Sequence, residues 1–438
     1  MTGKTGRSPF DHVETVSADA FRDIMERLGP WMPDTDNVPP VALAVSGGGD
    51  SMALAMLAST WRKHLVAFIV DHGLRPEFEQ EAATAMETLL HLGIPVTRLA
   101  VKSLPYGSGL ADRARKARYA ELIAACRQVG AVDLLVAHQA DDQVETVAMR
   151  RERGSGTGLS GMAAITELAD IRIVRPLLGY SRETLRHTLR HAGLQWCDDP
   201  SNQNEQAERV RVRKHLDCPE KNALWQLATQ AAVSRTAYED TMAVDLVQAG
   251  CHISCGWVVL GSALPSPETL AALVRCIGGR DYAPSLESIR EICLNEKQAT
   301  VGGARLIRRK SEGERPDQWL LVREAATIQD ALPADDGALW DRRFRLRCKR
   351  PLPNGCFIGA AGTGIRRPER QGLPAVVTGT LPALWKDGER MCVPHLGLYA
   401  DEAFRDVSFD FVPPSPVTAA NRWMNIYLTS TPLPCMDQ

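Results

Sequence analysis

The chain has 438 residues and a formal net charge of −2, and it is 44% hydrophobic and 24% charged. This composition is typical of a globular protein with two or three domains. It argues against a membrane protein, because apolar runs such as VALAV are too short to cross a bilayer, and against a basic surface that covers the whole molecule.

The first residues, MTGKTGRSPFDHVETV, lack the apolar core of a secretory signal. The eleven cysteines have no regular spacing, so a disulfide framework is not indicated. We expect reduced thiols and a cytoplasmic location.

The first half of the chain alternates short apolar runs with helical patterns. A leading helix at 18–29 ends in a proline-rich segment, and the runs and patterns that follow are strands at 41–45, 65–70, 95–101 and 132–138 and helices at 51–61, 76–93 and 110–130. This order predicts an α/β fold with a doubly wound parallel sheet. Ligands of such sheets bind beyond the carboxyl ends of the strands, so VSGGGDS, VDHGLR and AHQADDQ should meet in one crevice.

The sequence predicts four parts and a tail. A glycine-rich loop at 151–162 is followed by a helix at 181–192, which Ser181 caps and Gly193 ends. Beyond residue 218 the pattern is helical, then strand-like at 256–264, then hairpin-like at 301–310, and a break at 332–340 opens a region richer in proline and glycine. The predicted parts are 1–38 (arm), 39–218 (α/β domain), 219–330 (mainly helical), 335–425 (small α+β) and 426–438 (tail).

The glycine triplet at 47–49 follows a strand and precedes a helix, which is an arrangement suited to anion binding. Its spacing matches neither G-x-x-x-x-G-K-[ST] nor G-x-G-x-x-G. Backbone N–H groups and the hydroxyls of Ser46 and Ser51 can hold a pyrophosphate, and Asp50 beside it can help to bind Mg²⁺. A tight turn with structural glycines is the alternative.

Acidic residues begin the helix that follows AHQ. Asp141 and Glu145 are one turn apart, with Asp142 between them, and they can bind ammonium groups or accept a proton. The alternative is that these acids only compensate the helix dipole, and this alternative is stronger for Asp141 than for Asp142 or Glu145.

Arginines recur at close spacing in several segments. Arg115 and Arg118 share a helix face and can contact phosphate oxygens, with surface ion pairs as the alternative. Arg209, Arg211 and Arg213 alternate, which favours an extended segment facing a phosphate strand. RRFRLRCKR at 342–350 has six basic residues in nine and predicts a strand with one basic face, either for RNA or as a solvated edge, and 304–310 and 364–370 are also basic.

Several motifs occur in a definite order: SGGGDS, DHGLR, ARKARY, AHQADDQVET, RGSGTGLSGM, RPLL, DDPSN and RVRVRKHL. Together they resemble the bacterial tRNA(Ile)-lysidine synthetases of the PP-loop ATP pyrophosphatase superfamily. The resemblance covers roughly residues 15–425 and is densest at 41–216. It implies that ATP adenylates the C2 oxygen of the wobble cytidine in a CAU anticodon and that the ε-amine of L-lysine then displaces AMP.

The resemblance also implies residue roles. ATP, with Mg²⁺ at Asp50, would contact Ala44, Ser46, Gly47, Gly48, Gly49, Asp50, Ser51, Asp71, His72 and His138. Lysine would contact Asp141, Asp142 and Glu145. Asp50, Asp142, Arg115 and Arg211 would be catalytic. tRNA(Ile) would contact Arg115, Arg118, Arg153, Arg209, Arg213, Arg342, Arg345 and Arg347. Either a monomer or a homodimer is compatible with these roles.

Two departures from the family pattern are Val210, where an asparagine is expected, and Gln139, where a second histidine is common. Glutamine cannot titrate near neutrality, so acid–base work at position 139 is ruled out.

The alternative function is a sulfur-inserting PP-loop enzyme, which needs reactive cysteines or a metal–sulfur site. The first half of the chain has only Cys126 and Cys197 and no C-x-x-C motif, which disfavours that alternative.

Overall fold

The computed structural model describes residues 8–71, 78–101, 110–154, 157–197, 208–309, 317–418 and 421–422. The chain forms two compact units, Met1–Ala237 with Ala420–Gln438, and Tyr238–Ala419. Among the described residues, no helix has the length and apolar character needed to span a bilayer. The predicted part boundaries near 218 and 330 stay predictions.

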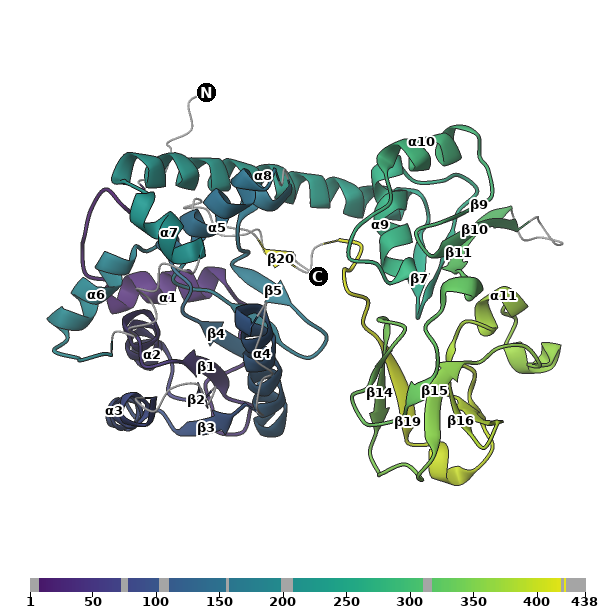
Figure 1. The fold of residues 1–438 in the computed structure, drawn as a ribbon, viewed down its shortest axis with the longest axis horizontal. Coiled ribbons are helices and arrows are strands. Elements are labelled where there is room, and N and C mark those ends of the chain that lie inside the picture. Colours follow the sequence, from purple (N-terminus) through teal and green to yellow (C-terminus); the bar gives the residue numbers. More distant parts are fainter. Residues whose placement is uncertain are drawn as a thin grey trace. The chain divides into compact units, whose positions relative to one another are not determined.

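The first unit is built on a seven-stranded sheet with the order β20-β5-β6-β4-β1-β2-β3 (Figure 1). Its strands are β1 (Val41–Val45), β2 (Leu65–Asp71), β3 (Val96–Ala100), β4 (Asp133–Val136), β5 (Ile165–Glu167), β6 (Arg172–Val174) and β20 (Asn421–Arg422). Strands β3, β2, β1, β4 and β6 are mutually parallel, whereas at one edge β5 pairs antiparallel with β6 and β20 pairs antiparallel with β5. The predicted α/β parallel-sheet class is confirmed, and the antiparallel edge is new.

Helices cover both faces of this sheet. Of the helices in residues 18–248, α2 (Gly49–Trp61), α3 (Phe78–His91) and α4 (Leu110–Val129) pack on its strands. The others are α1 (Ala18–Arg27), α5 (Ala140–Glu152), α6 (Arg182–His191), α7 (Glu208–His215) and α8 (Cys218–Gln248), with a 3₁₀ turn η1 (Thr157–Ser160).

Alternation along β1 explains the two layers. Leu43 and Val45 belong to the core shared with α2, whereas Ala42 and Ala44 belong to the core shared with α4. All five residues of β1 are buried, as expected for a parallel strand covered on both sides.

The second unit contains three antiparallel sheets, and α8 runs from the first unit into it as one continuous helix. The first sheet has β7 (His252–Ser254), β8 (Trp257–Leu260), β9 (Ala299–Val301), β10 (Ala304–Arg309) and β11 (Gln318–Arg323), with α9 (Pro267–Gly278) and α10 (Leu286–Leu294). Residues that follow form β12 (Leu332–Pro333), β13 (Leu339–Trp340), β14 (Phe344–Cys348), β15 (Cys356–Ala360), α11 (Ala375–Thr378), β16 (Pro382–Lys386), β17 (Glu389–Val393), β18 (Leu398–Tyr399) and β19 (Val407–Phe411). Leu270 and Leu273 of α9 pack on Trp319 and Leu321 of β11 to form a separate core.

Candidate functional site

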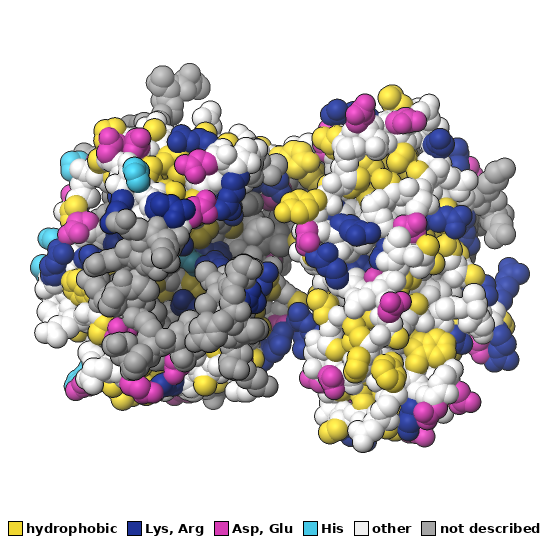
Figure 2. Space-filling model, in the orientation of Figure 1, with side chains coloured by type: hydrophobic (Ala, Val, Ile, Leu, Met, Phe, Trp, Pro, Cys, Tyr) yellow, Lys and Arg dark blue, Asp and Glu magenta, His cyan; other side chains and the backbone are white. Residues whose placement is uncertain are grey.

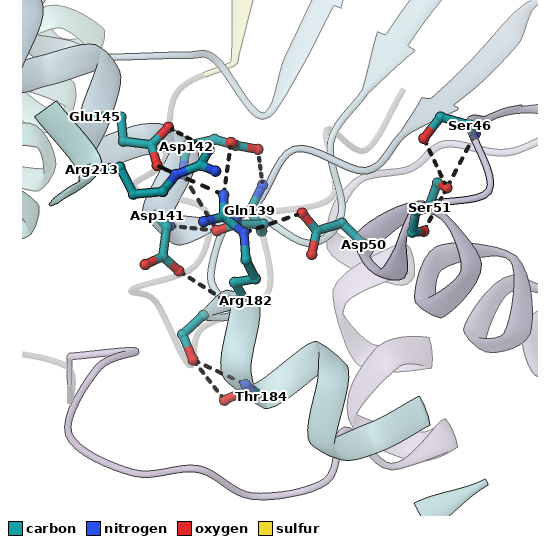
Figure 3. A network of polar contacts seen from close by, with 12 residues as sticks. Ser46, Asp50, Ser51, Gln139, Asp141, Asp142, Glu145, Arg182, Thr184 and Arg213 are labelled. Carbon is teal, nitrogen blue, oxygen red and sulfur yellow. Dashed lines mark hydrogen bonds and ion pairs between the residues drawn. The ribbon is translucent and has the colours of Figure 1, made fainter. Parts of the chain in front are cut away.

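The glycine turn after β1 leads directly into α2 and leaves the N-terminus of that helix without a side-chain cap. Gly47 has φ +82°, a conformation that favours glycine. The hydroxyl of Ser51 accepts from the Ser46 N–H at 3.2 Å and donates to the Gly48 carbonyl at 2.9 Å (Figure 3). The turn is thereby held in a shape that leaves the first N–H groups of α2 available to an anion.

Gly48 and Gly49 differ in what surrounds them. A Cβ at Gly49 would lie 3.3 Å from the Trp196 ring, so packing favours glycine there. A Cβ at Gly48 would meet nothing closer than 3.6 Å, at the Ser46 hydroxyl. Among the described residues, packing therefore does not require glycine at position 48.

A cavity of about 370 Å³ lies beside this turn. It is lined by Ala44, Ser46, Asp50 and Ser51 of the β1–α2 segment, by Ala114, Arg115, Arg118, Tyr119 and Leu122 of α4, and by Val136, Ala137 and His138 at the end of β4. Seven of the predicted site residues are thus brought together. Tyr119 was not predicted, although the guanidinium of Arg115, one helical turn earlier, lies 5.3 Å from its ring centre.

Asp71 does not line the cavity. Its carboxylate accepts from Arg98 at 2.6 Å, within an ion pair that also includes Glu79. The prediction for His72 lies outside the described residues.

Burial shifts the pKa of two residues that line the cavity. It raises the pKa of Asp50 from 3.8 to about 6, against the opposing effect of Arg182. Burial and the nearby Arg175 and Arg115 hold the pKa of His138 well below 6.5, so its imidazole is neutral at pH 7. Its Nδ1 is buried and has no hydrogen-bond partner among the described residues.

Gln139 caps α5. Its side-chain oxygen accepts from the N–H groups of Asp141 and Asp142, and the Asp142 carboxylate accepts from the Gln139 N–H at 3.2 Å. Because this oxygen faces the helix, the amide nitrogen of Gln139 points away from the helix, where it is buried and has no hydrogen-bond partner among the described residues. Asp142 therefore does cap the helix, in addition to any role in binding.

The carboxylates of α5 are ion-paired to three other helices (Figure 3). Glu145, 1% exposed, accepts from Arg209 Nε and Arg213 Nε, both at 2.6 Å. Asp142 accepts from Arg209 Nη2 at 3.0 Å. Asp141 accepts from Lys221 Nζ of α8 at 2.7 Å and from the Arg182 backbone N–H at 2.8 Å.

The pKa values of Asp141 and Asp142 shift in opposite directions. Burial would raise the pKa of Asp141, but the Arg182 N–H and Lys221 outweigh it and lower the pKa. Burial raises the pKa of Asp142 despite Arg209, with the nearby Glu145 adding to the rise. Asp142 is therefore a better proton acceptor than an ordinary aspartate.

The extended conformation expected for residues 209–213 is wrong, because these residues lie in helix α7. Arg209 and Arg213, four residues apart, share a face and both bind Glu145. Arg211 lies about 200° around the helix from Arg209 and is exposed. The alternating arginines suggested a strand, but the buried Val210 anchors a helix instead.

Sequence reasoning missed two cations of this cluster, Arg182 and Lys221. Arg182 is the first residue of α6, after the predicted and confirmed cap Ser181. No sequence pattern near either residue indicates a contact with α5. Both contacts join segments that are far apart along the chain.

Three of the predicted tRNA-binding arginines, which lie outside both the cavity and the α5 cluster, pair with acidic neighbours. Arg153 pairs with Glu208, Arg342 pairs with Asp281 at 2.6 Å, and Arg347 pairs with Asp410 at 2.7 Å. On the face shown in Figure 2, Lys and Arg form several separate groups among acidic side chains.

The single basic face predicted for 342–350 is shorter than expected. β14 begins at Phe344, and Arg345 and Arg347 lie on its more exposed side. Arg343 is fully buried and pairs with Asp341 at 2.8 Å. Asp341 and Arg342 have φ +49° and +56°, so the chain turns there and the strand alternation cannot continue back to 342.

A protein-family profile described as a PP-loop domain matches residues 20–219. The tRNA(Ile)-lysidine synthase of Ruegeria pomeroyi is 32% identical over 388 residues, which are 82% of this chain and 90% of that protein. The tRNA(Ile)-lysidine synthase of Hyphomonas neptunium is 36% identical over 311 residues, 64% of this chain and 82% of that protein. With this similarity extending over most of both chains, this protein belongs to the tRNA(Ile)-lysidine synthase family.

Proposed function

We propose that this enzyme uses ATP to join L-lysine to C2 of the wobble cytidine in the CAU anticodon of tRNA(Ile), releasing AMP and pyrophosphate. The observation that carries the proposal is the position of Asp50. It lines the cavity beside the glycine turn and also faces the α5 carboxylates through Arg182. The proposed nucleotide site and the proposed site for a cationic substrate would therefore be adjacent.

ATP would occupy the cavity, with its pyrophosphate end on the glycine turn and the N-terminus of α2. Mg²⁺ fits there, because it commonly uses one or two carboxylates together with substrate phosphates, and Asp50 supplies such a carboxylate. The ion would neutralise phosphate charge when bound. Ser46, Ser51 and the backbone N–H groups of the turn would orient the phosphates.

The cytidine would react in two steps. Its C2 oxygen attacks the α-phosphorus and pyrophosphate leaves, which converts that oxygen into part of a good leaving group. The neutral ε-amine of lysine then attacks C2 and AMP leaves with the oxygen. Arg115 and Arg118 would offset the negative charge on the α-phosphate, and neutral His138 would donate or accept a hydrogen bond.

The amine must lose a proton before it attacks. Asp142 is the proposed acceptor, because burial raises its pKa. Asp142 and Glu145 are also the two α5 acids that contact the Arg182 guanidinium. Asp141 and Glu145 would position the substrate ammonium groups together with Asp142. Arg209 and Arg213, which contact these acids, fit a catalytic role better than the exposed Arg211 does.

Incorporation of labelled lysine into transcripts tests this proposal. With purified protein and Mg-ATP, we expect lysine to enter a CAU-anticodon tRNA(Ile) transcript and not a methionine tRNA transcript. A reaction without ATP is the control. Cleavage of ATP to AMP and pyrophosphate on addition of tRNA, without lysine transfer, would contradict lysine as the nucleophile and point to another one, sulfur first.

Arg345 and Arg347, the two half-buried arginines of β14, are proposed to hold the tRNA backbone. We expect Arg345→Gln with Arg347→Gln to raise the Kd for tRNA(Ile) about tenfold and to flatten its dependence on salt, because two phosphate contacts are lost. ATP affinity should not change. Filter binding at two salt concentrations measures this effect.

Arg290→Gln is the matched control, since Arg290 on α10 of the same unit is 57% exposed and pairs with Glu268 on α9. Arg343 is not substituted, because it is buried and its loss would disturb folding. Equal losses of ATP and tRNA binding in the double variant would argue against a direct contact with tRNA.

A further inference from the structure

The Arg182 side chain lies between Asp50, in the first turn of α2, and the α5 acids (Figure 3). Its Nε lies 3.7 Å from Asp50 Oδ2. Its Nη2 lies 3.5 Å from Asp142 Oδ1 and 3.7 Å from Glu145 Oε1. The side chain is 20% exposed, so it is largely enclosed by these carboxylates.

Cations already offset the carboxylates of this cluster within the described residues, and Arg186 adds a further positive charge near Asp50. The ion pairs join four carboxylates (Asp50, Asp141, Asp142 and Glu145) to four cations (Arg182, Arg209, Arg213 and Lys221). An ammonium group that enters such a cluster adds a positive charge to a region of low dielectric. Its binding is unfavourable unless a resident cation leaves the carboxylates.

Contact distances identify the cation that is easiest to release. Arg209, Arg213 and Lys221 have their closest carboxylate contacts at 2.6, 2.6 and 2.7 Å. Those of Arg182 are 3.5 to 3.7 Å, longer than good charge-assisted hydrogen bonds. Arg182 is also the cation that contacts Asp50 at the edge of the nucleotide cavity, so phosphate oxygens bound there would be near its guanidinium.

We propose that Arg182 is an exchangeable positioning residue, whose guanidinium leaves Asp142 and Glu145 for the phosphates when ATP binds and thereby opens these carboxylates to the substrate ammonium. No bond is made or broken in this exchange. The identity of the amine as lysine rests on the proposed function. Because ATP draws Arg182 away from the carboxylates, the binding of ATP strengthens the binding of the amine, and the reverse.

Equilibrium binding of labelled L-lysine to the full-length protein, with and without α,β-methylene-ATP and with Mg²⁺ in both, tests the exchange. For the wild type we expect the analogue to strengthen lysine binding about tenfold, a typical coupling between two sites. For Arg182→Gln we expect less than about a twofold effect of the analogue. Lysine should then bind without nucleotide as tightly as it binds the nucleotide-loaded wild type. Arg182→Gln should also bind the analogue more weakly, whereas Arg182→Lys should retain most of the coupling.

Arg22→Gln is the control, because Arg22 is an exposed arginine of α1 in the same unit that pairs with Asp19. It should behave as the wild type. Thermal unfolding of each variant identifies loss of fold. Equal lysine affinity with and without the analogue in the wild type, or full coupling in Arg182→Gln, would overturn the exchange. If neither the wild type nor any variant binds lysine, the proposed amine is wrong. In that case, binding of the analogue still tests the exchange, and an unchanged affinity of Arg182→Gln for the analogue would overturn it.

Discussion

Asp50→Asn is expected to lower kcat/KM for ATP by about 10²–10³, because it removes the carboxylate proposed to hold Mg²⁺ at the phosphates. Release of AMP and pyrophosphate in the presence of tRNA measures this loss. Asp19→Asn, on the exposed surface of α1, is the matched control and should keep full activity. Activity close to wild type in Asp50→Asn would show that the glycine turn works without this carboxylate.

Asp50→Asn should lose activity without losing stability. The folded-state pKa of Asp50 is raised from 3.8 to about 6, so folding disfavours the ionised form. This penalty is absent well below pH 3.8, grows as the pH rises, and is complete above about 6. Asparagine has no charge to bury, so the variant should be more stable than the wild type at pH 8, by at most ~3 kcal/mol, and equal to it near pH 3.5 if both remain folded. Urea unfolding at the two pH values measures the difference.

Glu145→Gln is expected to destabilise the first unit by about 3–5 kcal/mol, because a buried ion pair loses one partner. Glu145 is 1% exposed and is bound by Arg209 and Arg213, so its loss leaves two guanidinium groups beside an uncharged amide. These contacts also hold α7 against α5. We expect a lower unfolding midpoint in urea and faster hydrogen exchange in residues 208–215.

Glu152→Gln is the control for this variant. Glu152 is the last residue of the same helix and is exposed, so its substitution should change stability by less than ~0.5 kcal/mol. Unchanged stability of Glu145→Gln would mean that the α7 arginines contribute nothing net to folding, and the proposed docking of α7 through Glu145 would be wrong.

The glycine turn and the cavity could be predicted because their signals are local. A buried apolar run such as VALAV followed by glycine and then a helical pattern predicts a strand, a turn and a helix N-terminus. Parallel strands carry the segments after β1 and β4 to the same edge of the sheet, so Asp50 and His138 line one cavity. Ser181 was likewise recognised as a helix cap from its immediate neighbours.

The sequence by itself determined the order of strands and helices at 41–136, the α/β parallel-sheet class and seven of the residues that line the cavity, because apolar periodicity, capping and glycine conformation act over a few residues. Tertiary structure decided which cations meet the α5 acids, since Lys221 and Asp141 are 80 residues apart and Arg209 and Glu145 are 64 apart. It also decided that Arg343 is buried while Arg345 is not, through a backbone turn at residues 341 and 342. Ion pairs of this kind depend on how separate helices pack, and that packing follows from the whole core rather than from any short stretch of chain.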